Sequence, residues 1–180
     1  VILDEAAERE VDLVVMGTHG TSGLERLLMG STTASVIRNV ALPVLAVPAA
    51  ASYQDPERIV LADDGGPVDR STLKVLLDIA RWSRSEVMIV HVVPEGRDAE
   101  ETFGGEYDKL LGAIPHTFHS VSGDDVLVAL NDLANQRDTD LAVVVHRHRG
   151  RIEQLFHRSV STELALHTHT PLLILQQASH

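Results

Sequence analysis

The sequence predicts an α/β fold built on a doubly wound, mostly parallel sheet of five strands. Short aliphatic runs, each bounded by glycine, proline or aspartate, alternate with stretches that have helical periodicity. Hydrophobic residues make up 44% of the chain but aromatic residues only 3%, so the core must be aliphatic. A core of this kind suits parallel strands whose two faces are covered by helices.

The expected elements fall into two series separated by a linker. The first series has an amphipathic helix at 1–10, a strand at 11–16, a helix that Ser31-Thr32-Thr33 can cap and a strand at 43–47. Residues 49–56 have no periodic pattern and are interpreted as a linker. The second series has strands at 58–62, 86–93, 116–121, 140–145 and 171–175, and helices at 69–84, 99–111, 124–137 and 159–166.

An internal repeat relates the two series. Residues 12–47 align without a gap onto residues 140–175, an offset of 128 (140 − 12 and 175 − 47). Under this alignment Ser31 matches Ser159, and each copy ends in a proline-initiated apolar strand. The repeat therefore indicates two copies of one α/β unit in the chain.

The predicted boundaries of the units follow from this repeat. Three further strands, beginning near Arg58, precede the second copy, and none precedes the first. We interpret 1–48 as the C-terminal part of a first domain, 49–56 as the linker and 57–177 as a complete second domain. The chain would then lack roughly 70 residues of its first unit before Val1, and we expect it to be a fragment.

A glycine-rich segment follows the first strand, with the pattern Gly17-x2-Gly20-x9-Gly30-Ser31. Glycines at a strand end let backbone N–H groups approach an anion closely. Gly30-Ser31 opens a helix, whose free N–H groups and positive dipole end favour negative charge. The segment predicts a phosphate site, and a tight strand-to-helix turn without a ligand remains the other interpretation.

Motifs in both units resemble the universal stress protein family. In the first unit, Val14–Gly20, Gly30-Ser31 and Leu42–Val47 resemble the end of the family's domain. In the second unit, Ile59–Gly66 resembles its first strand, His91–Val93 the end of its second strand and Ser122–Asp124 the turn after its third. The resemblance implies the family's adenine nucleotide α-hydrolase-like fold, with ATP as the expected ligand and no metal.

The resemblance also implies which residues form a nucleotide site. In the first unit, the ribose and phosphates are expected to lie against Gly17, Thr18, His19, Gly20, Gly30, Ser31 and Thr32. In the second unit, the corresponding residues are Asp64 at the nucleobase, Val93 at the end of the second strand and Ser159 at the start of the last helix.

The second unit departs from this pattern at its glycines. Val145, His148 and Arg158 stand where the first unit has its three motif glycines. Side chains then occupy the space where backbone would meet a phosphate, which argues against ordinary ATP binding there. The first unit keeps the loop but lacks, in this chain, the strand that would supply the nucleobase aspartate.

A basic cluster, His146–Arg149 followed by His157-Arg158, occupies the second unit's loop. Three interpretations stay open: a solvated loop, anion binding by arginine side chains, and a metal site completed by further histidines. Asp63-Asp64 at a strand end likewise suits either a turn cap or metal and acid–base chemistry. No Ser-His-Asp order or Walker pattern points to hydrolysis.

The composition argues against several classes of function. A formal net charge of −11 disfavours sequence-independent binding to nucleic acid or anionic membranes. The chain has no cysteine, which excludes disulfides, thiol catalysis and thiolate metal sites. No apolar run approaches the about 20 residues of a membrane span, and the acidic first helix does not resemble a signal peptide. A cytoplasmic location is expected.

We therefore expect a stress-response regulator that binds adenine nucleotide without robust catalysis and is not an enzyme. The alternatives are a nucleotide-independent, dimerising interaction module, and a weak ATPase or autophosphorylating protein with Ser31 or Thr32 as acceptor. In the family the last strand commonly pairs with that of another domain, which predicts Val44–Val47 against Leu172–Leu175. The strand at 13–16 would lack a neighbour, so we expect a homodimer, a higher oligomer or a partner chain to shield it.

Overall fold

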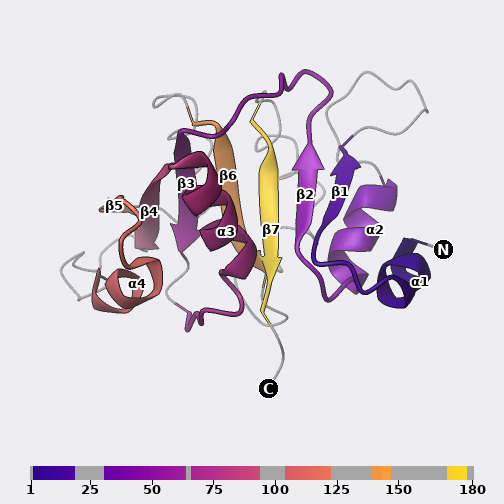
Figure 1. The fold of residues 1–180 in the computed structure, drawn as a ribbon, viewed down its shortest axis with the longest axis horizontal. Helices are drawn as coiled ribbons and strands as arrows, with labels where there is room; N and C mark the ends of the chain where they lie inside the picture. Colours follow the sequence, from indigo (N-terminus) through magenta and orange to yellow (C-terminus); the bar gives the residue numbers. More distant parts are fainter. Residues whose placement is uncertain are drawn as a thin grey trace.

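A computed structural model describes residues 2–18, 31–63, 66–93, 104–122, 139–146 and 170–177. Within these ranges the chain forms one sheet of seven strands, in the order β1-β2-β7-β6-β3-β4-β5 (Figure 1). The strands are β1 (Val14–Gly17), β2 (Val44–Val47), β3 (Arg58–Asp63), β4 (Glu86–Val93), β5 (His116–Ser122), β6 (Leu141–His146) and β7 (Leu172–Gln176). The helices are α1 (Ile2–Glu8), α2 (Ser31–Asn39), α3 (Lys74–Ser83) and α4 (Gly104–Leu111).

The sheet is doubly wound and mostly parallel, which confirms the predicted fold class. Five of the six strand pairs in the described sheet are parallel, and β2–β7 is antiparallel. From β3 the chain adds β4 and β5 on one side, and then returns to add β6 and β7 on the other. The five strands expected in 57–177 are β3 to β7, and β2 and β1 extend this sheet to seven.

The antiparallel pair joins the two series of elements. Val44 lies opposite Ile174, and both side chains are fully buried. The pairing predicted between these two last strands is therefore confirmed, within one chain. Because β2 and β7 run in opposite directions (Figure 1), the carboxyl ends of β1 and β2 lie at one edge of the sheet, and those of β3, β4, β6 and β7 lie at the opposite edge.

The offset of the sequence repeat also relates two strand pairs in space. Val14 pairs in parallel with Val44, and Ala142 pairs in parallel with Leu172. Each residue of the second pair therefore lies 128 positions after its counterpart in the first (142 − 14 and 172 − 44). The backbone N–H of Val14 also donates to the Pro43 carbonyl at 2.9 Å. At the matching place in the second pair, the backbone N–H of Ala142 donates to the Pro171 carbonyl at 3.0 Å. The two segments thus share one strand register, while the division of the chain into domains remains a prediction.

Side chains of the sheet alternate between two aliphatic cores, one on each face. On one face, Val36 and Ile37 of α2, and Val40 just after it, pack against β2 and the centre of the sheet. On the other face, α3 and α4 pack against β3, β4, β6 and β7, and Tyr107 is the aromatic member of that core. Apolar side chains therefore cover both faces of the central strands, as is usual for parallel strands.

Helix α3 is shorter than the periodicity predicts. We expected a helix over 69–84, but it begins at Lys74. Asp69 Oδ1 accepts hydrogen bonds from Thr72 N and from Ser71 Oγ, both at 2.7 Å. The carboxylate therefore holds a separate turn before the helix, which is a common role for aspartate.

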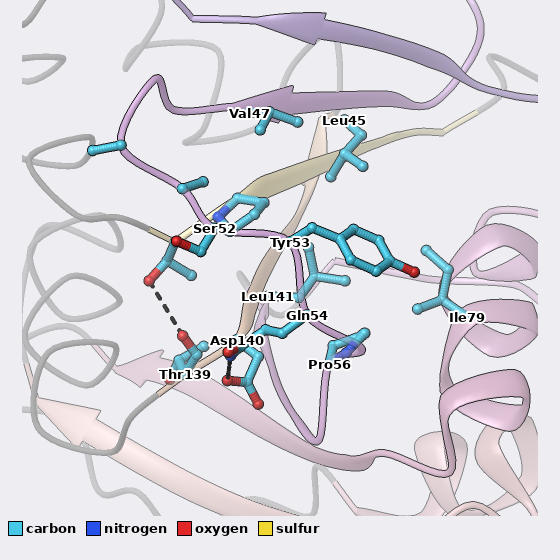
Figure 2. A pocket seen from close by; sticks show the side chains of 14 residues that line it. Leu45, Val47, Ser52, Tyr53, Gln54, Pro56, Ile79, Thr139, Asp140 and Leu141 are labelled. Carbon is cyan, nitrogen blue, oxygen red and sulfur yellow. Dashed lines mark hydrogen bonds between the residues drawn. The ribbon is translucent and has the colours of Figure 1, made fainter.

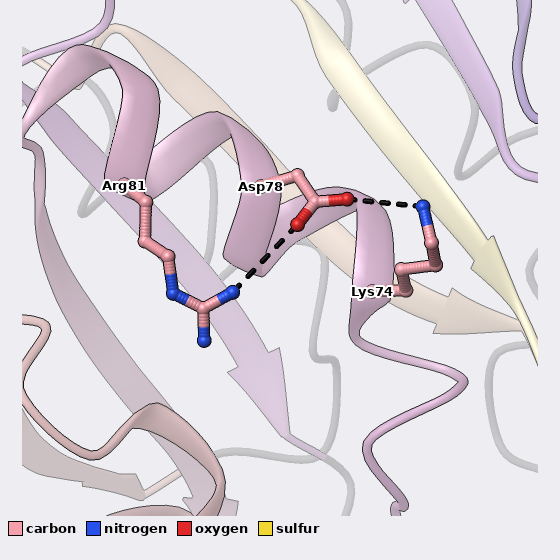
Figure 3. Close-up of polar contacts among 3 residues, drawn as sticks. All are labelled: Lys74, Asp78 and Arg81. Atoms are coloured by element: carbon pink, nitrogen blue, oxygen red, sulfur yellow. Dashed lines mark hydrogen bonds and ion pairs between the residues drawn. The ribbon is translucent and has the colours of Figure 1, made fainter.

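The exposed face of α3 carries a short row of charges. Asp78 lies between Lys74, at 3.0 Å, and Arg81, at 3.6 Å (Figure 3). All three side chains are largely exposed, and such pairs contribute little to stability. The helix is held mainly by its buried apolar face, which includes Leu76 and Leu77.

The remaining expected elements differ in extent or lie outside the described residues. The strand expected at 11–16 begins only at Val14, because its neighbour in the described sheet, β2, begins at Val44. Residues 99–103 of the helix expected at 99–111, and the helices expected at 124–137 and 159–166, lie outside the described residues.

Candidate functional site

The first candidate site lies at the carboxyl end of β1. Thr18 N donates to the Val47 carbonyl at 3.0 Å, so the chain stays attached to β2 as it leaves β1. Thr33, in the first turn of α2, donates its hydroxyl to the Gly17 carbonyl at 2.9 Å. This bond ties the N-terminus of α2 to the end of β1, and the side chains of Thr18 and Thr33 are buried.

The chemistry of this edge suits an anion. Helix α2 begins at Ser31, and the first N–H groups of a helix have no acceptor within it. They carry the positive end of the helix dipole, and the Thr33 bond fixes their position relative to Gly17. Thr32 is exposed beside them and offers a hydroxyl. A phosphate bound here would be held mainly by backbone groups.

A second candidate site lies at the carboxyl ends of β3 and β4, at the opposite edge of the sheet. Asp63 ends β3 and lies opposite His91 in the parallel register. His91 Nδ1 is 3.1 Å from Asp63 Oδ2, and Tyr107, from α4, donates its hydroxyl to Asp63 Oδ1 at 3.1 Å. Asp63 is only 3% exposed, and its two partners are also buried.

This buried cluster lies where the order of the strands reverses. Strand β3 has β4 on one side and β6 on the other. In doubly wound sheets, ligands bind beyond the carboxyl ends of the strands at such a point. The cluster of Asp63, His91 and Tyr107 therefore lies at the edge where the second unit would bind a ligand.

The surroundings of the cluster keep the Tyr107 phenol protonated. Burial raises the pKa of the Tyr107 phenol, and the charge of Asp63 and the hydrogen bond to it raise that pKa further. The phenol is therefore protonated at neutral pH and can donate to the carboxylate. A buried carboxylate between tyrosine and histidine is stabilised in place, whereas a general base has to face its substrate.

The structure separates the predicted nucleotide-site residues into two groups. Gly17, Thr18, Ser31 and Thr32 lie at the first edge, and Val93 ends β4 at the opposite edge. The others lie outside the described residues: His19, Gly20, Gly30, Asp64 and Ser159. Since β2 and β7 are antiparallel, Val93 and Gly17 cannot belong to one site within a chain. Of the basic cluster, His146 ends β6 and the rest lies outside the described residues.

Sequence reasoning did not identify the buried cluster as a unit. It considered Asp63 only together with Asp64, and it used His91 only as a strand end. A signal was present, because two polar residues end otherwise apolar strands and the parallel register places them side by side. Nothing in the sequence places Tyr107, since its position depends on how α4 packs on the sheet.

Residues 1–48, which include β1, α2 and β2, match the universal stress protein family. This confirms the resemblance found in the sequence. A universal stress protein of Methanocaldococcus jannaschii is 50% identical over 46 residues, which cover 26% of this chain and 27% of that protein.

Two relatives from Mycobacterium tuberculosis extend the likeness. A universal stress protein is 32% identical over 85 residues, 46% of this chain and 29% of the relative. The sensor protein KdpD is 32% identical over 114 residues, 61% of this chain and 13% of the relative. The chain thus spans less than a third of the length of each of these curated relatives.

Solved universal stress proteins share the fold of the described chain. The crystal structure from Archaeoglobus fulgidus superposes with a TM-score of 0.70 at 18% identity, covering 99% of this chain and 64% of that one. A universal stress protein in complex with cAMP superposes with a TM-score of 0.54 at 22% identity, covering 68% of this chain and 98% of that one. At these identities the likeness establishes the fold and leaves the ligand to be argued from the site.

The described part of the chain contains no helix long and apolar enough to cross a membrane. Within those same residues, no group of three or more histidine, aspartate or glutamate side chains is arranged to hold a metal ion. The histidines that follow β6 lie outside the described residues.

Proposed function

We propose that this protein is a cytoplasmic, adenine-nucleotide-binding stress regulator without robust catalysis. The observation that carries the proposal is the hydrogen bond from the Thr33 hydroxyl to the Gly17 carbonyl. It holds the start of α2 beside the end of β1, where the glycine pattern predicts a phosphate. The cAMP complex of a universal stress protein with the same fold supports a nucleotide as the ligand.

The net charge of the chain bears on how a nucleotide would be held. With a formal net charge of −11, the long-range field of the protein repels a phosphate. Binding then has to come from short-range contacts, namely backbone N–H groups and the positive end of the α2 dipole. These contacts depend on the position of the helix start, which the Thr33 bond determines.

The burial of Asp63 at the second site also favours a binding role over catalysis. The Asp63 carboxylate is buried and bound to His91 and Tyr107, so it does not face the solvent as a free acid or base. At the first site, the Thr33 hydroxyl is already engaged with a carbonyl. These contacts support binding and signalling more than turnover.

Calorimetric titration of ATP into this chain tests the proposal. We expect saturable binding that Gly17→Val weakens by about tenfold or more, because a branched side chain enters the space for the phosphate. Thr33→Val keeps the shape but removes the hydroxyl, and should weaken binding about fivefold, the worth of one hydrogen bond. Thr33→Ser is the matched control, because it keeps the hydroxyl and should retain affinity.

Two results would overturn the nucleotide proposal. The first is no heat of binding for the unmodified chain, and the second is equal affinity in Thr33→Val, Thr33→Ser and the unmodified chain. The rival enzymatic function is tested on the same proteins by measuring phosphate release. Steady, protein-dependent release that disappears in Gly17→Val would favour a weak ATPase.

The exposed edge of the sheet favours a second candidate, an interaction module. Strand β1 is an edge strand in the described sheet, and Val15 on it is 60% exposed. An edge strand with an exposed apolar side chain is a template for pairing with another chain. We propose that β1 mediates self-association, which sedimentation at increasing concentration would detect. Val15→Lys should shift the protein toward monomer, and an unchanged distribution would contradict this candidate.

A further inference from the structure

A cavity of about 660 Å³ lies beneath the linker, at the junction of β2, β6 and β7 (Figure 2). Residues 50–54 and Pro56 form one wall, and Ile79 of α3 forms another. The remaining walls are the end of β2 and the residues that begin β6 and β7. Its volume is within the range of about 300–1,000 Å³ typical of small-molecule sites.

The walls of this linker cavity are mostly apolar. Leu45 and Val47 of β2 line it, together with Leu141 of β6 and Ile79 of α3. Figure 2 shows the Tyr53 ring directed toward Ile79 across the opening. Tyr53 is 88% exposed, so its ring is available to stack on a bound molecule.

One polar group beside the cavity is unsatisfied. Thr139 lines the cavity and is only 7% exposed, and its hydroxyl oxygen, which has almost no accessible surface, is the buried side-chain oxygen without a hydrogen-bond partner among the described residues. Buried hydroxyls normally have a partner, because an unpaired one costs about 1–3 kcal/mol. Rotation of the Thr139 side chain about χ1 would turn the hydroxyl toward the cavity, where a molecule with one donor or acceptor would satisfy it.

The other polar groups show which ligands are disfavoured. Asp140 Oδ2 accepts hydrogen bonds from the backbone N–H groups of Glu57 and Arg58, at 2.9 and 2.8 Å. Gln54 donates to the other oxygen of the same carboxylate. No lysine, arginine or histidine is among the described residues that line the cavity. From these described residues a phosphate or carboxylate would meet the negative charge of Asp140 and no cation.

We infer that the linker cavity binds a neutral, mostly apolar small molecule with one hydrogen-bonding group, which pairs with Thr139. The cavity lies at the same edge of the sheet as the proposed nucleotide site but on the opposite face, because Leu45, Ile79 and Leu141 belong to the core under α3, whereas α2 packs on the other core. Neither Gly17 nor Thr33 lines the cavity, so the inference does not depend on the proposed nucleotide site. Since the ligand would contact both the linker and α3, its binding would restrain the linker against the sheet.

The test uses N-phenyl-1-naphthylamine, a neutral probe with one N–H that fluoresces in apolar surroundings. We expect saturable, one-to-one binding to the chain. Ala51→Trp and Ile79→Trp fill the cavity from opposite walls, and each should weaken binding about tenfold or more. Thr139→Val removes only the hydroxyl and should weaken binding about fivefold. Circular dichroism and thermal unfolding confirm that each variant is folded.

Two controls separate this cavity from other sites. Ile2→Ser alters an exposed apolar residue of α1, which packs with α2 on the opposite face of the sheet, and should leave the affinity for the probe unchanged. Excess ATP should not displace the probe. The inference is overturned by non-saturable binding, by unchanged affinity in both folded tryptophan variants, by loss of binding in Ile2→Ser, or by displacement with ATP. Unchanged affinity in Thr139→Val would overturn the role of the hydroxyl.

Discussion

Asp63 and His91 are paired through both backbone and side chains. Their residues lie opposite each other in the parallel register of β3 and β4, and His91 Nδ1 approaches Asp63 Oδ2 to 3.1 Å. Tyr107 donates to the other oxygen of the same carboxylate. Because the carboxylate is buried, the loss of either partner leaves its charge less well compensated. The stability of this edge of the sheet therefore depends on the cluster.

Replacing Tyr107 by phenylalanine should destabilise the fold by about 1.5–3 kcal/mol, the usual worth of a hydrogen bond to a charged group. Tyr53→Phe is a matched control, because Tyr53 also donates to a carboxylate, that of Asp55 at 3.1 Å, but is 88% exposed. Its loss should change stability by less than about 0.5 kcal/mol. Urea unfolding measures both, and equal effects would contradict a special role for the buried cluster.

The raised pKa of Tyr107 should also make stability depend on alkaline pH. In the unfolded chain the phenol ionises near pH 10, whereas the folded chain holds it protonated to higher pH. The stabilisation is therefore complete below about pH 10 and is lost as pH rises above it, by up to about 1.4 kcal/mol per pH unit. Unfolding free energies should fall more steeply above that pH in the unmodified chain than in Tyr107→Phe. Parallel curves would contradict the prediction.

Most of the fold was predictable from local signals, because every strand except β5 is a mainly apolar run with its own boundaries. Strand β5 is mostly polar and was expected from its place in the alternation of strands and helices. The pairing of β2 with β7 was also expected, from the family resemblance. The consequence for the site is clear only in three dimensions: one antiparallel pair puts Gly17 and Val93 at opposite edges. The linker cavity was missed because it depends on the path of the linker across the sheet. Residues 49–56 have no periodic pattern from which that path could be predicted.

His116 should titrate above the usual pKa of histidine. Its Nδ1 lies 2.7 Å from the Ile114 carbonyl, and its Nε2 lies 2.8 Å from Asp108 Oδ1. The hydrogen bond to Ile114, followed by that to Asp108, raises the pKa, because both acceptors favour the doubly protonated ring. The resulting stabilisation is fully present below about pH 6.5 and is lost as pH rises through the folded pKa.

An NMR titration of the His116 ring protons measures this pKa directly. Asp108→Asn removes the charge but keeps the size of the side chain, so it should lower the pKa of His116 while the bond to the Ile114 carbonyl remains. A His116 pKa at or below the usual value in the unmodified chain would contradict the prediction, and so would an Asp108→Asn chain with an unchanged His116 titration.

Asp140 should control how tightly the linker is held against the sheet. Its carboxylate accepts from the backbone N–H groups of Glu57 and Arg58, and the backbone N–H of Asp140 donates to the Arg58 carbonyl at 2.9 Å. Asp140→Ala removes the side-chain part of this connection and should cost about 1–2 kcal/mol. It should also increase opening of the linker, which chymotrypsin would detect as faster cleavage after Tyr53.

The matched control is Asp55→Ala, which removes a carboxylate from the linker itself. Asp55 accepts from the exposed Tyr53 hydroxyl, so its loss does not free the end of the linker from β6. We therefore expect cleavage after Tyr53 to accelerate several-fold in Asp140→Ala and to stay near the unmodified rate in Asp55→Ala, because opening governs proteolysis when it is rapid and reversible. Equal rates in the two variants would show that the Asp140 carboxylate does not hold the linker. Cleavage slowed by N-phenyl-1-naphthylamine in the unmodified chain would connect this attachment to the linker cavity.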